Sequence, residues 1–171
     1  MLSGSKVYLR VLKKEDISIL FKLHSEEKVK KYNIIIDSMD NKVDLRKALS
    51  IINEDDNLIG FVTYKEQGHY SRIYCIGITI GSEYWGRSYG VDSIKILLRY
   101  LFKKLNAIKV ELYVASYNMR AINCYKKCGF IEEDIKRYSS YIDREYIDII
   151  IMGIIRERYN SYLKCEDGKY V

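Results

Sequence analysis

The segment IGITIGSEYWGRSYGVDSIKI, residues 76–96, constrains the fold more than any other part of the sequence. A strand is predicted to end at Gly81, and a helix is predicted from Ser88 to about Asn106, because apolar residues recur there at helical spacing. A strand that turns sharply into a helix directs unpaired backbone N–H groups and the positive end of the helix dipole at one point. The sequence therefore predicts a phosphate-binding site at this turn.

Composition places the chain among globular proteins of one domain. Its 171 residues are 48% hydrophobic, with charged residues interspersed, so we expect a single domain over residues 1–171 with a substantial core. The net charge of +6 favours an anionic ligand, but the basic residues are scattered, and we predict no nucleic-acid partner. No apolar run approaches the ~20 residues of a membrane span, and the start MLSGSKVYLR lacks the apolar core of a signal peptide. We therefore expect a cytoplasmic protein with no membrane partner.

The cysteines and histidines do not follow a metal-binding pattern. No CxxC pair occurs, and His24 and His69 are the only histidines. Cys124 and Cys128 lie one helical turn apart, which is typical of two small apolar residues on one helix. We predict free thiols, no metal, and surface positions for both histidines.

Alternating apolar residues and turn signals predict about seven strands. These strands span residues 6–12, 48–54, 57–66, 72–81, 109–115, 131–142 and 146–155. Because the helix over 88–106 crosses between the fourth and fifth strands, these two should be parallel. The fold class predicted is therefore α/β (α+β), a mixed and mainly antiparallel sheet flanked by helices.

Three further helices are predicted. One begins at Glu15, a short one covers residues 27–32, and one covers residues 120–128, capped by Asn118 and ended by Gly129. A looser segment is expected after Tyr32, and a frayed tail after about residue 157.

Two stretches in order, YWGRSYGVDSIKILLRYLF and NMRAINCYKKCGF, resemble the pyrophosphate-binding motif and the following Asn-to-Tyr helix of the GNAT superfamily of N-acetyltransferases. The resemblance is closest to the branch of ribosomal-protein alanine and serine acetyltransferases and spermidine acetyltransferases. It covers nearly the whole chain, because KVYLR, LIGFVTY and the tyrosine-rich final hairpin also have the look of that branch. Either motif alone is weak evidence, but their order and separation by one strand make the pair specific.

The resemblance implies a binding site for acetyl-coenzyme A as co-substrate. The backbone of the turn would hold the pyrophosphate, main-chain groups of the preceding strand would pair with the pantetheine arm, and the second helix would add further contacts. The residues implied in these contacts are Ile78, Thr79, Ile80, Arg87, Ser88, Tyr89, Gly90, Val91, Asn118, Ala121 and Lys127. Tyr125, two helical turns from Asn118, would be the general acid that protonates the departing thiolate.

Three positions depart from the family pattern. Asp92 follows the turn, and its carboxylate should point away from the phosphates to avoid like-charge repulsion. Ser88 stands where close relatives have glycine, which requires a backbone conformation that serine can adopt. Cys75 stands where many relatives carry a glutamate base, so the amine would lose its proton to water or to Glu111 or Glu83.

The sequence thus predicts an N-acetyltransferase that moves acetyl from acetyl-coenzyme A to a primary amine by direct attack. The acceptor is left open between a protein N-terminus, a polyamine and another small amine, and a homo-oligomer is also left open. A non-catalytic acyl-coenzyme A sensor is the alternative, motivated by Cys75 and Asp92. Cys75 is not predicted to be a nucleophile, since no histidine is placed to activate it, and Trp85 is predicted to pack beside the turn rather than to contact a ligand.

Overall fold

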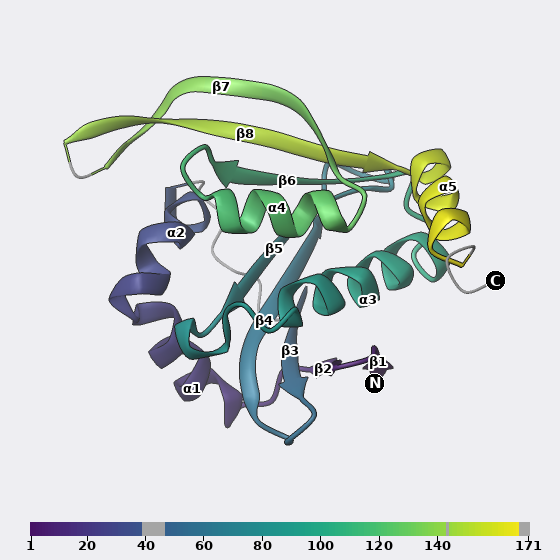
Figure 1. The fold of residues 1–171 in the computed structure, drawn as a ribbon, viewed down its shortest axis with the longest axis horizontal. Helices are drawn as coiled ribbons and strands as arrows, with labels where there is room; N and C mark the ends of the chain where they lie inside the picture. The colour runs from purple at the N-terminus through teal and green to yellow at the C-terminus, as the bar shows by residue number, and fades with distance from the viewer. Residues whose placement is uncertain (39–46, 143, 168–171) are drawn as a thin grey trace.

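The computed structural model describes residues 1–38, 47–142 and 144–167. Among these, eight strands form one sheet in the order β1-β2-β3-β4-β5-β6-β8-β7 (Figure 1). The strands are β1 (Leu2–Ser3), β2 (Val7–Val11), β3 (Ala48–Asn53), β4 (Leu58–Glu66), β5 (Ile73–Ile80), β6 (Lys109–Ala115), β7 (Ile131–Ile142) and β8 (Glu145–Ile155). The pairs along this order are antiparallel except β5 with β6, which are parallel because α3 connects them. The predicted mixed, mainly antiparallel sheet is confirmed, and the short β1 is the strand that the sequence did not reveal.

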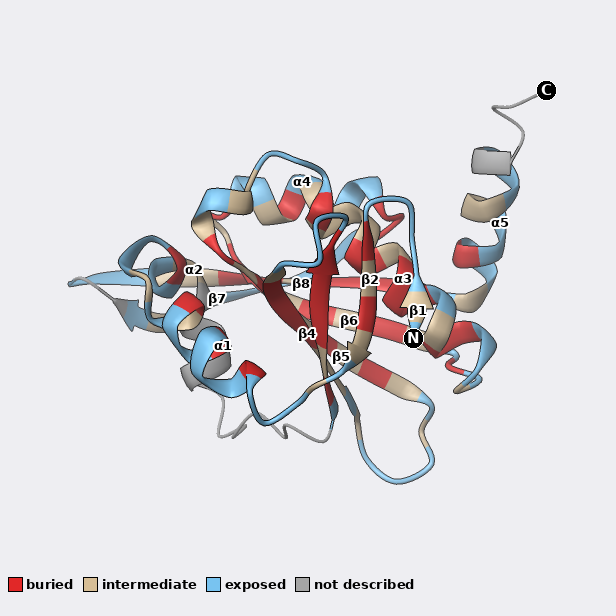
Figure 2. Cartoon of the chain, turned by 90° about the horizontal axis from the view of Figure 1, so that it is seen from below, coloured by how far each residue is buried: buried red, intermediate tan, exposed pale blue. Residues whose placement is uncertain are grey.

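Helices cover both faces of the sheet (Figures 1 and 2). They are α1 (Asp16–Ser25), α2 (Glu27–Ser38), α3 (Tyr89–Lys103), α4 (Met119–Lys127) and α5 (Arg156–Asp167). Successive residues of β4 point to opposite faces of the sheet. Phe61 packs with α1 on one face, whereas Val62 belongs to the larger core that includes α3 on the other. That larger core is continuous from β2 to β8 and contains the fully buried Leu97, Leu98 and Leu101 of α3.

The C-terminal tail is helical where fraying was expected. Helix α5 occupies residues 156–167, and Tyr159 is only 3% exposed, stacked on Phe102 at 4.5 Å between ring centroids. The Tyr162 hydroxyl also donates to the carbonyl of Lys127 at 2.9 Å. Tyr159, Tyr162 and Leu163 follow i, i+3, i+4 spacing, and this short apolar stripe anchors an otherwise polar segment against α3 and α4.

Other differences from the sequence predictions are smaller. Helix α2 continues to Ser38 rather than ending near residue 32, and most of the segment expected to be looser, residues 39–46, lies outside the described residues. His69 is exposed as predicted, whereas His24 is half-buried beside Phe61. All four cysteines are free thiols, as predicted. No helix within the described ranges is long and apolar enough to span a membrane.

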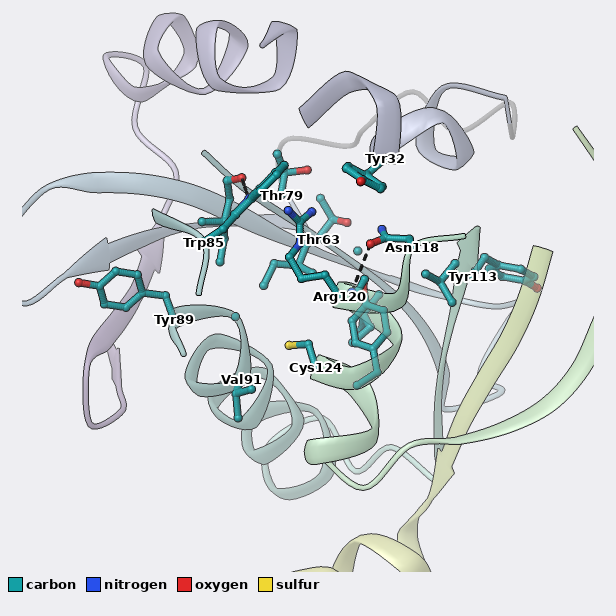
Figure 3. Close-up of a pocket in the computed structure, with 18 of the residues that line it drawn as sticks. Tyr32, Thr63, Thr79, Trp85, Tyr89, Val91, Tyr113, Asn118, Arg120 and Cys124 are labelled. Carbon is teal, nitrogen blue, oxygen red and sulfur yellow. Dashed lines mark hydrogen bonds between the residues drawn. The ribbon is translucent and has the colours of Figure 1, made fainter. Parts of the chain in front are cut away.

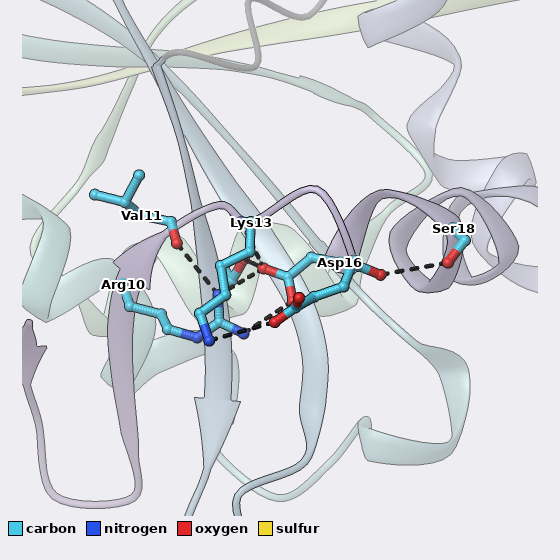
Figure 4. Close-up of polar contacts among 7 residues, drawn as sticks. Arg10, Val11, Lys13, Asp16 and Ser18 are labelled. Atoms are coloured by element: carbon cyan, nitrogen blue, oxygen red, sulfur yellow. Dashed lines mark hydrogen bonds and ion pairs between the residues drawn. The ribbon is translucent and has the colours of Figure 1, made fainter.

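A buried ion pair joins β2 to the start of α1 (Figure 4). Asp16, 3% exposed, accepts from both guanidinium nitrogens of Arg10 at 2.6 and 2.8 Å, from the Lys13 amide at 2.9 Å and from the Ser50 hydroxyl at 2.8 Å. These donors, above all Arg10, hold the pKa of Asp16 far below its usual value despite the opposing effect of burial. The network therefore fixes α1 against β2 and β3.

The sheet opens between the two parallel strands β5 and β6. β5 pairs with β6 only over Ile73–Cys75 and Lys109–Glu111, while β6 continues alongside β8 as far as Ala115. Beyond Cys75 the two strands diverge, and Figure 1 shows β6 and β8 crossing the top of the view while β3, β4 and β5 run below. The edge of β5 from residues 76 to 80 that faces this opening is therefore not paired with β6.

Candidate active site

A cavity of about 700 Å³ lies in the opening between β5 and β6 (Figure 3). Its walls come from α2, the C-terminal parts of β4, β5 and β6, the turn before α3, the first turn of α3, and α4 along its whole length. Tertiary structure thus brings together the two stretches of sequence, residues 76–91 and 118–127, that the motifs singled out.

Nearly all the predicted site residues line this cavity. Those that do so are Ile78, Thr79, Ile80, Ser88, Tyr89, Gly90, Val91, Asn118, Ala121, Tyr125 and Lys127. Arg87 does not line it; its side chain is exposed, and its carbonyl accepts from the Nζ of Lys6 at 3.2 Å. The contact predicted for Arg87 is made by its backbone amide in the turn, and that contact stays a prediction.

The turn has the backbone geometry of an anion-binding loop. Gly86 has φ +79°, and Ser88, the N-cap of α3, has φ +66° and ψ +6°. Serine thus adopts the left-handed conformation that glycine adopts more readily, at a cost of about 1 kcal/mol. The first turn of α3, whose N–H groups have no partner within the helix, borders the cavity through Ser88, Tyr89 and Gly90.

Asp92 points away from this turn, as predicted. Its carboxylate accepts from the amides of Ser5, Lys6 and Val7 at 3.2, 2.7 and 3.0 Å. The negative charge is therefore taken up by the N-terminal segment, and the positive end of the α3 dipole remains available to an anion.

The open edge of β5 offers a second kind of contact. Its backbone from Ile76 to Ile80 pairs with β4 on one side, in register from Tyr64 to Gly60, and borders the cavity on the other. An extended chain that carries amide groups can pair with such an edge as an additional strand. The pantetheine arm of coenzyme A is a chain of this kind.

Asn118 and Tyr125 lie on the α4 wall. The Asn118 side chain caps the helix by accepting from the Ala121 amide at 3.2 Å, as the sequence predicted. Tyr125 is 7% exposed, and its ring contacts Phe130 edge-on at 6.0 Å. Burial raises the pKa of the Tyr125 hydroxyl well above its ordinary value. The phenol therefore stays protonated across the physiological pH range.

The residues considered in connection with the general base, Cys75, Glu111 and Glu83, differ in their position relative to the cavity. Cys75 lines the cavity, and burial, followed by the charge of Glu111, raises the pKa of its thiol to about 11. Cys75 is thus neither thiolate nor base near pH 7. Glu111 lies opposite Cys75 in the register, is bonded by the Tyr113 hydroxyl at 3.4 Å and pairs with Lys109 at 3.5 Å. Glu83 is exposed and is not among the residues lining the cavity.

Sequence reasoning missed an aromatic and cationic cluster in one wall. Trp85, predicted to pack beside the turn, also lines the cavity. Its ring contacts the guanidinium of Arg120 and the ring of Tyr32, both of which also line the cavity. The available signal was Arg120 itself, because a cation in the first turn of a helix opposes the helix dipole.

Comparison with known proteins agrees with the geometry. The family model described as the acetyltransferase (GNAT) family matches residues 16–130. The chain belongs to the GNAT family. It is an acetyl-CoA-dependent N-acetyltransferase with the GNAT fold, and the non-catalytic sensor considered above is not favoured.

Relatives named for their activity support the spermidine acetyltransferase branch expected from the motifs. The chain is 27% identical over 167 residues to the spermidine N(1)-acetyltransferase of Vibrio cholerae, covering 91% of this chain and 96% of the relative. It is 28% identical over 169 residues to the Escherichia coli K12 enzyme of the same name, covering 93% and 91%. The crystal structure of the Vibrio cholerae spermidine N-acetyltransferase in complex with CoA and spermine has a TM-score of 0.77 at 25% identity, covering 90% of this chain and 98% of that one. A GNAT-family acetyltransferase from Bacillus anthracis shares the fold, with a TM-score of 0.78 at 18% identity and coverage of 91% and 98%.

Replacing Gly90 tests the wall where α3 meets α4. A Cβ at this position would lie 3.2 Å from the Cys124 sulfur and 3.8 Å from the Ile80 side chain, so the larger valine side chain would fill space inside the cavity. We expect Gly90→Val to weaken CoA binding by at least ~1.4 kcal/mol, a factor of ten, without unfolding the protein. Calorimetric titration with CoA measures the affinity, and thermal melting checks the fold. Unchanged affinity would remove this turn from the binding site.

Proposed function

We propose that this GNAT enzyme transfers acetyl to a primary amine by direct attack on the thioester, with Tyr125 as the general acid. The observation that carries the proposal is the position of Tyr125, buried on α4 at a cavity that the open edge of β5 also borders. A thioester held along that edge and a protonated phenol would then share one small space. Direct attack needs no covalent acetyl-enzyme, and the Cys75 thiol, which stays protonated, is not a nucleophile near pH 7.

We assign each group of residues in the site a separate role. The turn and first helical turn from Ser88 to Val91 bind the phosphates, and the backbone of Ile78, Thr79 and Ile80 pairs with the pantetheine arm. Backbone donors along the same edge polarise the thioester carbonyl, and holding the two reactants together replaces a bimolecular encounter. As sulfur leaves, the hydroxyl of Tyr125 donates its proton to it. Asn118, Ala121 and Lys127 complete the wall on the α4 side.

Spermidine or spermine is the acceptor class that the relatives suggest. Two relatives are named spermidine N(1)-acetyltransferases, and a structural neighbour is a complex with CoA and spermine. A protein N-terminus is the second candidate, motivated by the resemblance of the motifs to ribosomal-protein acetyltransferases. An assay of free thiol release from acetyl-CoA against polyamines, monoamines, amino acids and ribosomal-protein N-terminal peptides decides between them. Binding of acetyl-CoA with no thiol release for any amine would contradict the proposed function.

The pH dependence tests how the amine loses its proton. With a thiol at position 75, we expect deprotonation through water, so the rate should follow the free-amine fraction and rise toward the acceptor's own pKa, about 10 for a primary amine. Installing a carboxylate by Cys75→Glu should move the rising limb to lower pH. The measurement is kcat/KM for a fixed acceptor between pH 6 and 10. A wild-type profile that levels off near pH 7 would instead identify a base in the protein, and Glu111→Gln would then be the first variant to measure, with Glu83→Gln as its exposed counterpart.

A further inference from the structure

Arg120 occupies an electrostatically unfavourable place for a cation. It lies in the first turn of α4, a turn that contains no acidic residue, where the positive end of the helix dipole repels positive charge. The guanidinium is partly desolvated, and burial is the main reason that its pKa is lowered. Because the helix dipole and the partial desolvation both disfavour the positive charge of Arg120, we expect another interaction to stabilise this charge.

Aromatic rings hold the guanidinium in place at the cavity wall (Figure 3). It lies 3.2 Å from the centroid of the Trp85 ring and 4.9 Å from that of Tyr32. Trp85 is itself fixed, because its indole N–H donates to the carbonyl of Ile80 at 2.8 Å. Stacking on a ring occupies the face of a guanidinium and leaves the N–H groups of its planar edge to bind an anion.

Within the described residues, the ion pairs involve other cations, namely Arg10, Lys13, Lys109, Lys126 and Arg137. The groups that act electrostatically on Arg120 are Tyr32, Tyr125 and Cys124, and none of these is a carboxylate. The guanidinium of Arg120 is exposed on the side away from the rings, so its planar edge is free to form hydrogen bonds with an anion. The aromatic wall therefore presents a preorganised cation to whatever fills the cavity.

We infer that Arg120, stacked on Trp85, binds a phosphate oxygen of the coenzyme A diphosphate, beside the backbone amides of the turn. The inference rests on the proposed function, and it adds a specificity-determining residue that the motif did not contain. Arg120 lines the same cavity as Gly86, Ser88 and Gly90, so an anion bound at the start of α3 would share this space with the guanidinium. Arg87, by contrast, is not among the residues that line the cavity. A guanidinium recognises two phosphate oxygens at once, which an ammonium does not.

Calorimetric titration with three ligands tests this assignment. Arg120→Gln should weaken binding of CoA and of dephospho-CoA by the same factor, roughly 10- to 100-fold, because both keep the diphosphate. Binding of pantetheine, titrated to millimolar concentration, should not change, because pantetheine has no phosphate. Arg120→Lys should recover part of the lost affinity for CoA, which also shows that the position tolerates replacement. Lys126→Gln is the matched control on the same helix; Lys126 is exposed and pairs with Glu132 at 2.7 Å, and its loss should leave all three affinities unchanged.

Each alternative gives a different pattern. An equal loss for pantetheine would mean that Arg120 only shapes the wall, and a loss for CoA but not for dephospho-CoA would place the guanidinium on the 3′-phosphate. Unchanged CoA affinity in Arg120→Gln, with an acceptor-dependent rise in KM, would assign it to an anionic group of the acceptor. Any of these results overturns the inference while the proposed function stands. A wild-type protein that binds no CoA would instead overturn the proposed function.

Discussion

Replacing Tyr125 with phenylalanine is expected to lower kcat by roughly 10²- to 10⁴-fold while leaving the affinity for acetyl-CoA close to that of the wild type. The change removes one hydroxyl and keeps the ring, which is the part that contacts Phe130 in the core. The departing thiolate then has no protein donor, so the transition state loses stabilisation that the ground state never had. Steady-state kinetics with saturating acceptor gives kcat, and calorimetry gives the affinity.

Tyr159→Phe is the matched control for this prediction. Tyr159 is also a buried tyrosine, but it stacks on Phe102 at 4.5 Å and is not among the residues that line the cavity. Its variant should keep kcat near the wild-type value. Because burial raises the pKa of the Tyr125 hydroxyl, wild-type activity should also show no descending limb from loss of this acid below about pH 10. Turnover by Tyr125→Phe at nearly the wild-type rate would show that the thiolate leaves without this donor.

Replacing Asp16 with asparagine is expected to lower the free energy of unfolding by about 3 kcal/mol at pH 7. The variant leaves the guanidinium of Arg10, whose side chain is 23% exposed, facing a neutral amide where it had a carboxylate at 2.6 Å. Asparagine also cannot accept at all the positions where Asp16 accepts from Arg10, Lys13 and Ser50. Urea denaturation measures the loss, and Glu15→Gln is the control, since its exposed ion pair with Lys13 contributes little.

The same pair gives a pH dependence with a defined sign. The pKa of Asp16 is lower in the folded protein than the ~3.9 of an unfolded chain, so the unfolded state binds the proton more readily. This contribution to stability is complete above the unfolded-state pKa and is lost as the pH falls through it toward the folded-state value. Wild-type stability should therefore fall more steeply between pH 5 and pH 3 than that of Asp16→Asn. Parallel curves for the two proteins would contradict this account of the network.

The elements that build the site were predictable because their signals are local. Periodicity and caps placed α3 and α4 within a few residues, and the spacing from Asn118 to Tyr125 put both on the helix wall of the cavity. Charge repulsion alone predicted the outward direction of Asp92. Side-chain contacts between elements that are distant in the sequence were not predictable in this way. Nothing in the sequence around Trp85 or Arg120 reveals that the two side chains stack, because the contact depends on how α4 packs beside the turn.

Helix α5 and strand β1 were also not predicted, for the same reason: they depend on tertiary contacts. Helix α5 is polar over most of its length, and its stability comes from burying Tyr159 against Phe102, a residue of α3. Strand β1 has two residues, too few for an alternating pattern to be recognised, and it exists through pairing with Tyr8 and Leu9. Such elements depend on tertiary partners rather than on their own propensity.

The separation of β5 from β6 also bears on how the chain folds. The strands on one side of the opening come from one continuous stretch, residues 2–80, and those on the other from a second, residues 109–155. Each stretch contains hairpins whose contacts are close in sequence, β3-β4-β5 in the first and β7-β8 in the second, and such contacts form fastest. Only the short parallel pairing of Ile73–Cys75 with Lys109–Glu111 then has to join them, across the α3 connection. We expect this parallel junction to form after the local hairpins β3-β4-β5 and β7-β8, so that the cavity is completed later than the hairpins on either side of it.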